Sequence, residues 1–262
     1  PIPVFAEMGS VNPIFILPNR LYTDSNLPNQ LSDSIKLGTG QFCTNPGLIL
    51  LLGNETSSFL EELKLETLKG EISCMVHPNI SKNYELQLQN MKNQGASVFR
   101  ASLDSNSPAI GVISGEDAIK KPILLEEVFG PFSLVVLCST ISELMIVTEA
   151  LPGQLTATVL GNIDELKENR ELLNIIQNKV GRLLFEGLPT GVSVSPSMNH
   201  GGPFPASTDS RFTSVGTSSI HRWLRPICFQ DCPKELLPDA LKNENLLGIY
   251  RTVNKQLTKS SL

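Results

Sequence analysis

The chain has 262 residues, which is enough for one large domain or two small ones with a buried core. Hydrophobic residues make up 40% of it and charged residues 18%, as is typical of a globular protein. The formal net charge is −5 and no basic stripe is visible, so we expect no nucleic-acid partner. The longest apolar run, residues 48–52, is far too short to cross a bilayer, so we expect no membrane association.

Five cysteines in a chain of this length do not form a disulfide framework, and an odd number leaves at least one thiol free. We therefore expect a reducing, cytoplasmic location. The chain opens with Pro1 rather than Met, and no basic, apolar leader is visible. We expect it to be a truncated form of a longer protein.

Short apolar runs alternate with longer amphipathic segments in the first part of the chain. The apolar runs predict strands, and apolar residues at three- and four-residue spacing predict helices. The expected elements, in chain order, are a strand over 15–17, helices over 57–69 and 81–93, strands over 97–101 and 133–138, a helix over 140–151, a strand over 155–160, a helix over 164–180 and a strand over 182–185. This alternation indicates an α/β fold, with a mostly parallel sheet and helices on both faces.

The rest of the chain has a different character. Residues 188–216 are rich in Gly, Pro, Ser and Thr and predict a long irregular loop, a kind that is usually functional in a compact domain. Residues 225–232 predict one more strand and residues 234–242 a short helix, while the chain from 255 onward is expected to fray. No G-x-G-x-x-G or Walker-type phosphate loop occurs.

Three segments carry residues that could perform chemistry. Residues 38–47 (GTGQFCTNPG) place Cys43 in a Gly-rich turn, where free backbone N–H groups can lower a thiol pKa from about 8.5 and hold an oxyanion. A single cysteine beside an apolar run is, however, more often a buried small hydrophobe. Residues 7–13 (EMGSVNP) place Glu7 before a small-residue turn, as a base or as a solvated carboxylate. Residues 126–131 (EEVFGP) place two acids, usually solvated, at a strand entrance.

In this order, the three segments resemble signature motifs of the aldehyde dehydrogenase superfamily. Residues 7–13 resemble the element E-L-G-G-K-N-P, residues 40–43 the element G-Q-x-C, and residues 126–131 the element E-E-I-F-G-P. Glu7 and Cys43 are 36 residues apart, which is similar to the family's spacing. Further resemblance downstream extends the match from residue 7 to about residue 232.

The resemblance implies roles for four residues. Cys43 would be the nucleophile that forms a thiohemiacetal and then a thioester, and Glu7 would activate the water that hydrolyses it. Glu127 would bind the nicotinamide ribose of NADP or NAD, and Phe129 would pack beside the nicotinamide. The product of this chemistry is a carboxylate made from an aldehyde.

Phe42, His200 and Phe204 are the candidates for binding a small aldehyde substrate. His200 lies in the Gly-rich loop, and a role as an ordinary polar loop residue is as compatible with the sequence. We expect no metal site, because Cys228 and Cys232 have a single histidine nearby and lack a fourth ligand.

Finer features resemble the branch that oxidises 2,5-dioxovalerate (α-ketoglutaric semialdehyde) and often prefers NADP; they lie in residues 40–49 and 199–233. There are departures, since Val11 stands where many members have Lys and Ser10 where they have Gly. In the family the cofactor-binding domain precedes the Glu motif, and no residue here can be mapped to it.

We therefore expect residues 1–262 to be an aldehyde dehydrogenase catalytic domain that lacks its own N-terminal cofactor domain and is inactive alone. Residues 188–216 would be its closing loop. Residues 225–232 would be an oligomerisation strand in a homodimer or homotetramer.

Two alternatives stay open. One is a cofactor-independent thiol esterase that uses Cys43 and Glu7, and the other is a non-catalytic, self-associating fragment. Dependence on cofactor distinguishes the first alternative from a dehydrogenase, and size-exclusion behaviour partly distinguishes the second.

Overall fold

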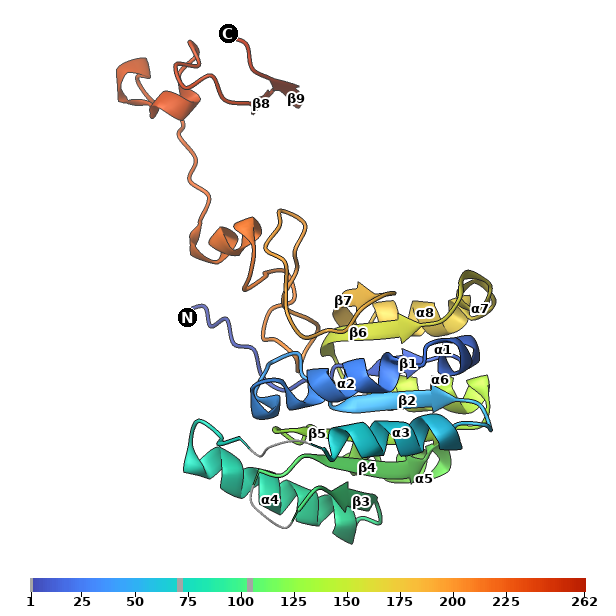
Figure 1. Ribbon diagram of the computed structural model, residues 1–262. Coiled ribbons are helices and arrows are strands. Elements are labelled where there is room, and N and C mark those ends of the chain that lie inside the picture. Colours follow the sequence, from blue (N-terminus) through green and yellow to red (C-terminus); the bar gives the residue numbers. More distant parts are fainter. Residues whose placement is uncertain (1, 70–72, 103–105) are drawn as a thin grey trace. The chain divides into compact units, whose positions relative to one another are not determined.

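The computed structural model describes residues 2–69, 73–102 and 106–262 (Figure 1). The chain divides into two compact units, residues 1–222 and residues 223–262.

Unit 1 is built on a seven-stranded sheet with the order β3-β4-β5-β2-β1-β6-β7. Every neighbouring pair is parallel except β3 and β4, which are antiparallel. The strands are β1 (Ile14–Ile16), β2 (Leu48–Leu52), β3 (Ser97–Arg100), β4 (Ala109–Ser114), β5 (Phe132–Cys138), β6 (Gln154–Leu160) and β7 (Val180–Leu184). The predicted α/β class with a mostly parallel sheet is confirmed.

The side chains of the sheet alternate between two apolar clusters, one on each face. On β1, Phe15 lies in one cluster while Ile14 and Ile16 lie in the other. The first cluster also takes in α4 (Pro78–Asn93), α5 (Gly115–Lys120), α6 (Ile141–Ala150) and α8 (Arg170–Gln177), and the second takes in α2 (Leu27–Lys36) and α3 (Ser57–Thr67). Helices thus cover both faces, as Figure 1 shows. Each fully buried Leu, Ile or Phe side chain in these clusters stabilises the fold by about 1.5–3 kcal/mol relative to an exposed one.

Most elements predicted in unit 1 are present with shifted ends. The helix expected over 164–180 is two helices, α7 (Ile163–Glu168) and α8, which meet at Asn169. Asn169 leaves the helical region, with φ −101° and ψ 35°, and its side chain donates to the backbone oxygen of Glu165. Such side-chain bonds compete with the helix ladder, which explains the break. The structure adds α1 (Pro18–Thr23), α2, β2, β4 and α5, which were not expected.

Unit 2 corrects two expectations. Within the described residues of this single chain, residues 225–232 pair with no strand; their role as an oligomerisation strand needs a second copy and stays a prediction. The helix expected over 234–242 is wrong, because Pro238 separates two short 3-10 turns, η4 (Lys234–Leu236) and η5 (Asp239–Leu241). The chain from 255 onward was expected to fray, but Gln256–Thr258 form the strand β9, which pairs with β8 (Arg251–Val253).

The β8–β9 hairpin turns at Asn254 and Lys255, which both have positive φ, of 48° and 69°. Two left-handed residues are what a two-residue hairpin turn needs to match the twist of its strands. Within the described ranges, no helix has the length and apolar character that crossing a bilayer requires.

Candidate active site

The three motif segments meet at one end of the sheet. Residues 7–13 lead into β1, residues 38–47 into β2 and residues 126–131 into β5. These three strands are adjacent and parallel. Because the amino ends of adjacent parallel strands lie at the same edge, the sheet brings the three segments together there.

The turn before Cys43 is shaped by residues in the left-handed region. Gly38, Thr39 and Gly40 all have positive φ, in the 3-10 turn η1 (Leu37–Gly40). A Cβ atom on Gly40 would lie 2.1 Å from the carbonyl carbon and oxygen of Gly130, so the backbones of the second and third motifs are in direct contact. Only glycine allows both the φ value and this approach.

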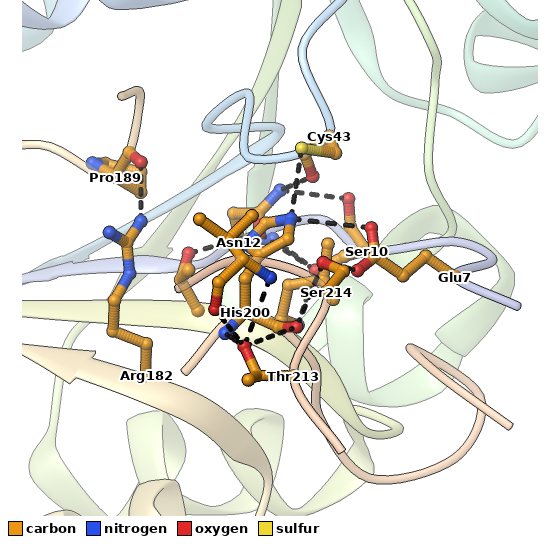
Figure 2. A network of polar contacts seen from close by, with 12 residues as sticks. Glu7, Ser10, Asn12, Cys43, Arg182, Pro189, His200, Thr213 and Ser214 are labelled. Atoms are coloured by element: carbon orange, nitrogen blue, oxygen red, sulfur yellow. Dashed lines mark hydrogen bonds and ion pairs between the residues drawn. The ribbon is translucent and has the colours of Figure 1, made fainter. Parts of the chain in front are cut away.

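Asn12 joins the first motif to the second. Its side chain is buried, and its Nδ2 donates to the backbone oxygens of Cys43, at 3.0 Å, and Asn45, at 2.9 Å. Its Oδ1 accepts from Thr156 Oγ1 on β6 at 3.1 Å. Figure 2 shows Asn12 beneath the Cys43 turn. A buried amide with both ends bonded fixes the turn against β1 and β6.

Cys43, His200 and Glu7 form one contact series (Figure 2). The Sγ of Cys43 lies 3.3 Å from Nε2 of His200, and the same Nε2 lies 3.4 Å from Oε2 of Glu7. The His200 side chain is 6% exposed and the Glu7 side chain 26%. The thiol and the carboxylate therefore flank one ring nitrogen.

The loop over 188–216 holds Glu7 as well as His200. The Oγ of Ser214 donates to Oε1 of Glu7, and the backbone N–H of Met8 donates to the oxygen of Ala206 at 3.0 Å. Glu7 also forms an isolated antiparallel bridge with Ser207. The first motif and this loop are thus fixed against each other by both backbone and side-chain bonds.

The thiol is not ionised by its surroundings. Burial raises the pKa of Cys43 above its ordinary value, and the charge of Glu7 raises it further. The backbone N–H groups of Cys43 and Thr44, and the charge of Arg182, oppose this shift without reversing it. The expected N–H groups are therefore present, but their lowering of the thiol pKa is outweighed. Burial also lowers the pKa of His200, against the charge of Glu7.

Glu127 lies beside the first motif, at a pocket of about 410 Å³. Burial raises the pKa of its carboxyl to about 7, although the backbone N–H of Ser10 works in the opposite direction. A Cβ atom on Gly9 would lie 3.1 Å from Oε2 of Glu127, so the glycine leaves room for the carboxylate. The pocket is lined by Gly9, Ser10, Val11, Pro122, Ile123, Leu125, Glu126, Glu127, Ala150, Pro152, Gln154 and Pro205.

The three aromatic candidates lie in different settings. Phe129 is half-buried, and its backbone N–H donates to Oε1 of Gln87 at 3.3 Å. The Phe42 ring packs against Gly38 and remains 40% exposed. Phe204 is 76% exposed. Their roles toward cofactor and substrate stay predictions.

Asn12 and Ser214 were not among the residues expected at the site. Asn12 belongs to the Asn-Pro pair of the first motif. Its role in holding the Cys43 turn is visible only from the hydrogen bond between its Nδ2 and the backbone oxygen of Cys43. Within the described part of the chain, no group of three or more metal-ligating side chains comes together.

The chain is similar to curated proteins along nearly its whole length, although no family model matches it. It is 38% identical to an alpha-ketoglutaric semialdehyde dehydrogenase of Acinetobacter baylyi, over 99% of this chain and 51% of that protein. It is 39% identical to alpha-ketoglutaric semialdehyde dehydrogenase 2 of Azospirillum brasilense, over 96% of this chain and 49% of that protein. The chain therefore spans about half the length of the curated relatives it matches.

Solved structures agree on the fold. The betaine aldehyde dehydrogenase of Staphylococcus aureus, solved in complex with NAD+, matches with a TM-score of 0.66 and 17% identity. The match covers 83% of this chain and 44% of that chain. The resemblance to aldehyde dehydrogenases, and to the semialdehyde branch, is confirmed by these comparisons.

Proposed function

We propose that this chain, which resembles aldehyde dehydrogenases along its length, is the catalytic domain of an NAD(P)-dependent aldehyde dehydrogenase. The observation that carries the proposal is the meeting of Cys43 and Glu7 at one nitrogen of His200. A nucleophile and a carboxylate placed together at the end of a rigid sheet suit acyl chemistry.

In the proposed reaction, Sγ of Cys43 attacks the aldehyde carbon and forms a C–S bond, while the π electrons move to oxygen. The backbone N–H of Cys43 stabilises the resulting oxyanion. A nicotinamide held by Glu127 and Phe129 would supply the hydride acceptor, and loss of the hydride from that carbon would leave a thioester on Cys43. Glu7 then takes a proton from the water that attacks the thioester, and the carboxylate product leaves.

The residues present fit the nicotinamide end of the cofactor. Glu127 offers carboxylate oxygens at a pocket whose volume lies within the usual range for small-molecule sites, and ribose hydroxyls can donate to such oxygens. Phe129 is half-buried three residues before β5. We propose that the rest of the NADP or NAD site comes from a cofactor domain outside these 262 residues, and that the chain is inactive without it.

We propose a short semialdehyde such as 2,5-dioxovalerate as the substrate. The names of the two curated relatives support it. We also propose that the complete enzyme is cytoplasmic, since a catalytic thiol has to be kept reduced. We propose further that it is a homodimer or homotetramer.

The first test uses an activated ester on the chain alone. p-Nitrophenyl acetate should acetylate Cys43, as detected by peptide mass spectrometry. Glu7→Gln should prolong the lifetime of the thioester, because the base that activates the hydrolytic water is lost. Acetylation spread evenly over the five cysteines would contradict the assignment.

The second test measures NAD(P)H fluorescence with 2,5-dioxovalerate. The chain is joined to the part of the Acinetobacter baylyi relative that it does not cover, and the isolated chain serves as the control. We expect reduction of NADP+ or NAD+ only by the joined protein. Ester hydrolysis without any cofactor reduction in the joined protein would favour the thiol esterase, because the series Cys43, His200 and Glu7 lies entirely within this chain.

A further inference from the structure

The hydrogen bonds that hold His200 in its loop are made by its backbone and not by its side chain. Its backbone N–H donates to Oγ1 of Thr213 at 2.7 Å, and its backbone oxygen accepts from the N–H of Ser214 at 2.8 Å. Main-chain bonds therefore fix this part of the loop. The imidazole is directed instead at Cys43 and Glu7, as Figure 2 shows.

A buried imidazole without hydrogen-bond partners would lower the stability of the fold. The side chain of His200 is 6% exposed, and burying an unpaired polar group costs about 1–3 kcal/mol. The described partners of its ring are Cys43 and Glu7, which are the nucleophile and the base of the proposed reaction. The contact with Sγ is direct, so no water or further side chain is needed between them.

We propose that His200 is the base that takes the proton of Cys43 as its sulfur attacks, with Glu7 holding the imidazolium that forms. The inference rests on the proposed function and adds a catalytic residue to it. The S–H bond breaks and an Nε2–H bond forms, while the sulfur electron pair makes the C–S bond. When the thioester is hydrolysed and the thiolate leaves, Nε2–H returns the proton to Sγ.

The charges around His200 suit a transfer that occurs only during attack. Burial raises the pKa of the thiol and lowers the pKa of the imidazole, so both groups are neutral before the reaction. Glu7 favours the imidazolium, whereas Arg182 and Arg222 disfavour it. The balance keeps His200 available as an acceptor and gives the imidazolium a counter-charge at 3.4 Å.

The contact geometry also separates this arrangement from a Cys-His-acid triad. In a triad the acid and the nucleophile lie at opposite ring nitrogens. Here Sγ and the carboxylate meet the same Nε2, so the base form of His200 carries its proton on Nδ1 and leaves Nε2 free to accept. The Nε2–H that forms on attack then lies beside the Glu7 carboxylate, which can accept from it.

The test is the rate of iodoacetamide alkylation of Cys43 against pH, in the whole 262-residue chain, with exposed Cys228 as the internal reference. In the wild type we expect two steps, a lower one from deprotonation of His200 and an upper one from the thiol itself. His200→Asn should remove the lower step and reduce the rate at neutral pH by at least about a hundredfold, the lower end of what a general base contributes. Its rate above the upper step should equal that of the wild type.

A second variant keeps the test decisive if His200→Asn does not fold. Glu7→Gln retains the imidazole, and both steps should move to lower pH because the carboxylate raises the pKa of both groups. A purely structural role would change the rate equally at all pH values. That result, or a single unchanged step in all three proteins, would overturn the inference.

The alkylation rates also distinguish a failure of the role proposed for His200 from a failure of the proposed dehydrogenase function. Fast labelling of Cys43 that is independent of His200 would overturn only the inference. Labelling of wild-type Cys43 no faster than that of Cys228 at any pH would overturn the proposed function too.

Discussion

Gly40 offers the sharpest test of how the site is assembled. Replacement by alanine meets two penalties, because its φ is +66° and the new Cβ would lie 2.1 Å from the carbonyl of Gly130. A left-handed conformation costs an alanine roughly 1–2 kcal/mol. Relieving an overlap in a packed region costs about 1–3 kcal/mol more. We therefore expect Gly40→Ala to destabilise the chain by about 2–5 kcal/mol.

Gly187→Ala is the matched control. Gly187 has a similar φ of +75°, but an added Cβ would meet no atom within 4 Å. Only the conformational penalty applies there. Since 1 kcal/mol shifts the Tm of a domain of this size by about 2–4 °C, the control should lose about 2–8 °C and Gly40→Ala about 4–20 °C.

Differential scanning calorimetry of both variants beside the wild type gives the two Tm shifts. Alkylation of Cys43 gives a second measure, because a displaced turn should slow it in Gly40→Ala but not in Gly187→Ala. Equal Tm shifts in the two variants would refute the claim that the second and third motifs touch through their backbones.

Three further outcomes are expected. Cys43→Ala should abolish NAD(P)H formation in the joined protein, and retained activity would point to another nucleophile. Asn12→Ala should cost about 2–5 kcal/mol, because the backbone oxygens of Cys43 and Asn45 lose their donor and because alanine is disfavoured at the φ of 45° found there. It should also reduce the labelling preference for Cys43, and an unchanged preference would contradict its positioning role. The pKa of Glu127 is raised from 4.5 to about 7, so the folded chain binds a proton that the unfolded chain has lost, and stability falls as pH rises through this range. Glu127→Gln should remove that fall in urea unfolding; an identical pH profile would contradict it.

The sequence predicted the secondary structure best where an apolar run forms an element that is buried on both faces. Apolar runs such as residues 133–138 are buried on both faces and became β5 at nearly the expected bounds. β2, by contrast, was not expected as a strand, although Leu48–Leu52 are all buried. A short apolar run is ambiguous until neighbouring strands are known, because its pairing with β1 and β5 is what makes it a strand.

The C-terminal part was predicted least well. Residues 225–232 have strand-like composition, but no described segment of the chain pairs with them, and backbone pairing is not a local property. The helix expected over 234–242 fails at Pro238, whose ring and missing N–H interrupt it. The β8–β9 hairpin depends on two residues at positive φ, which composition alone did not indicate.

The sequence by itself determined the fold class and three segments that resemble a dehydrogenase, because hydrophobic periodicity and short motifs are local in the chain. Only the tertiary structure decided how those segments are joined. Asn12 reaches Cys43 across 31 positions, and His200 reaches it across 157. The raised pKa values of Cys43 and Glu127 depend likewise on burial by distant elements. Contacts of this kind arise from the order of parallel strands in the sheet, which brings remote loops to one edge.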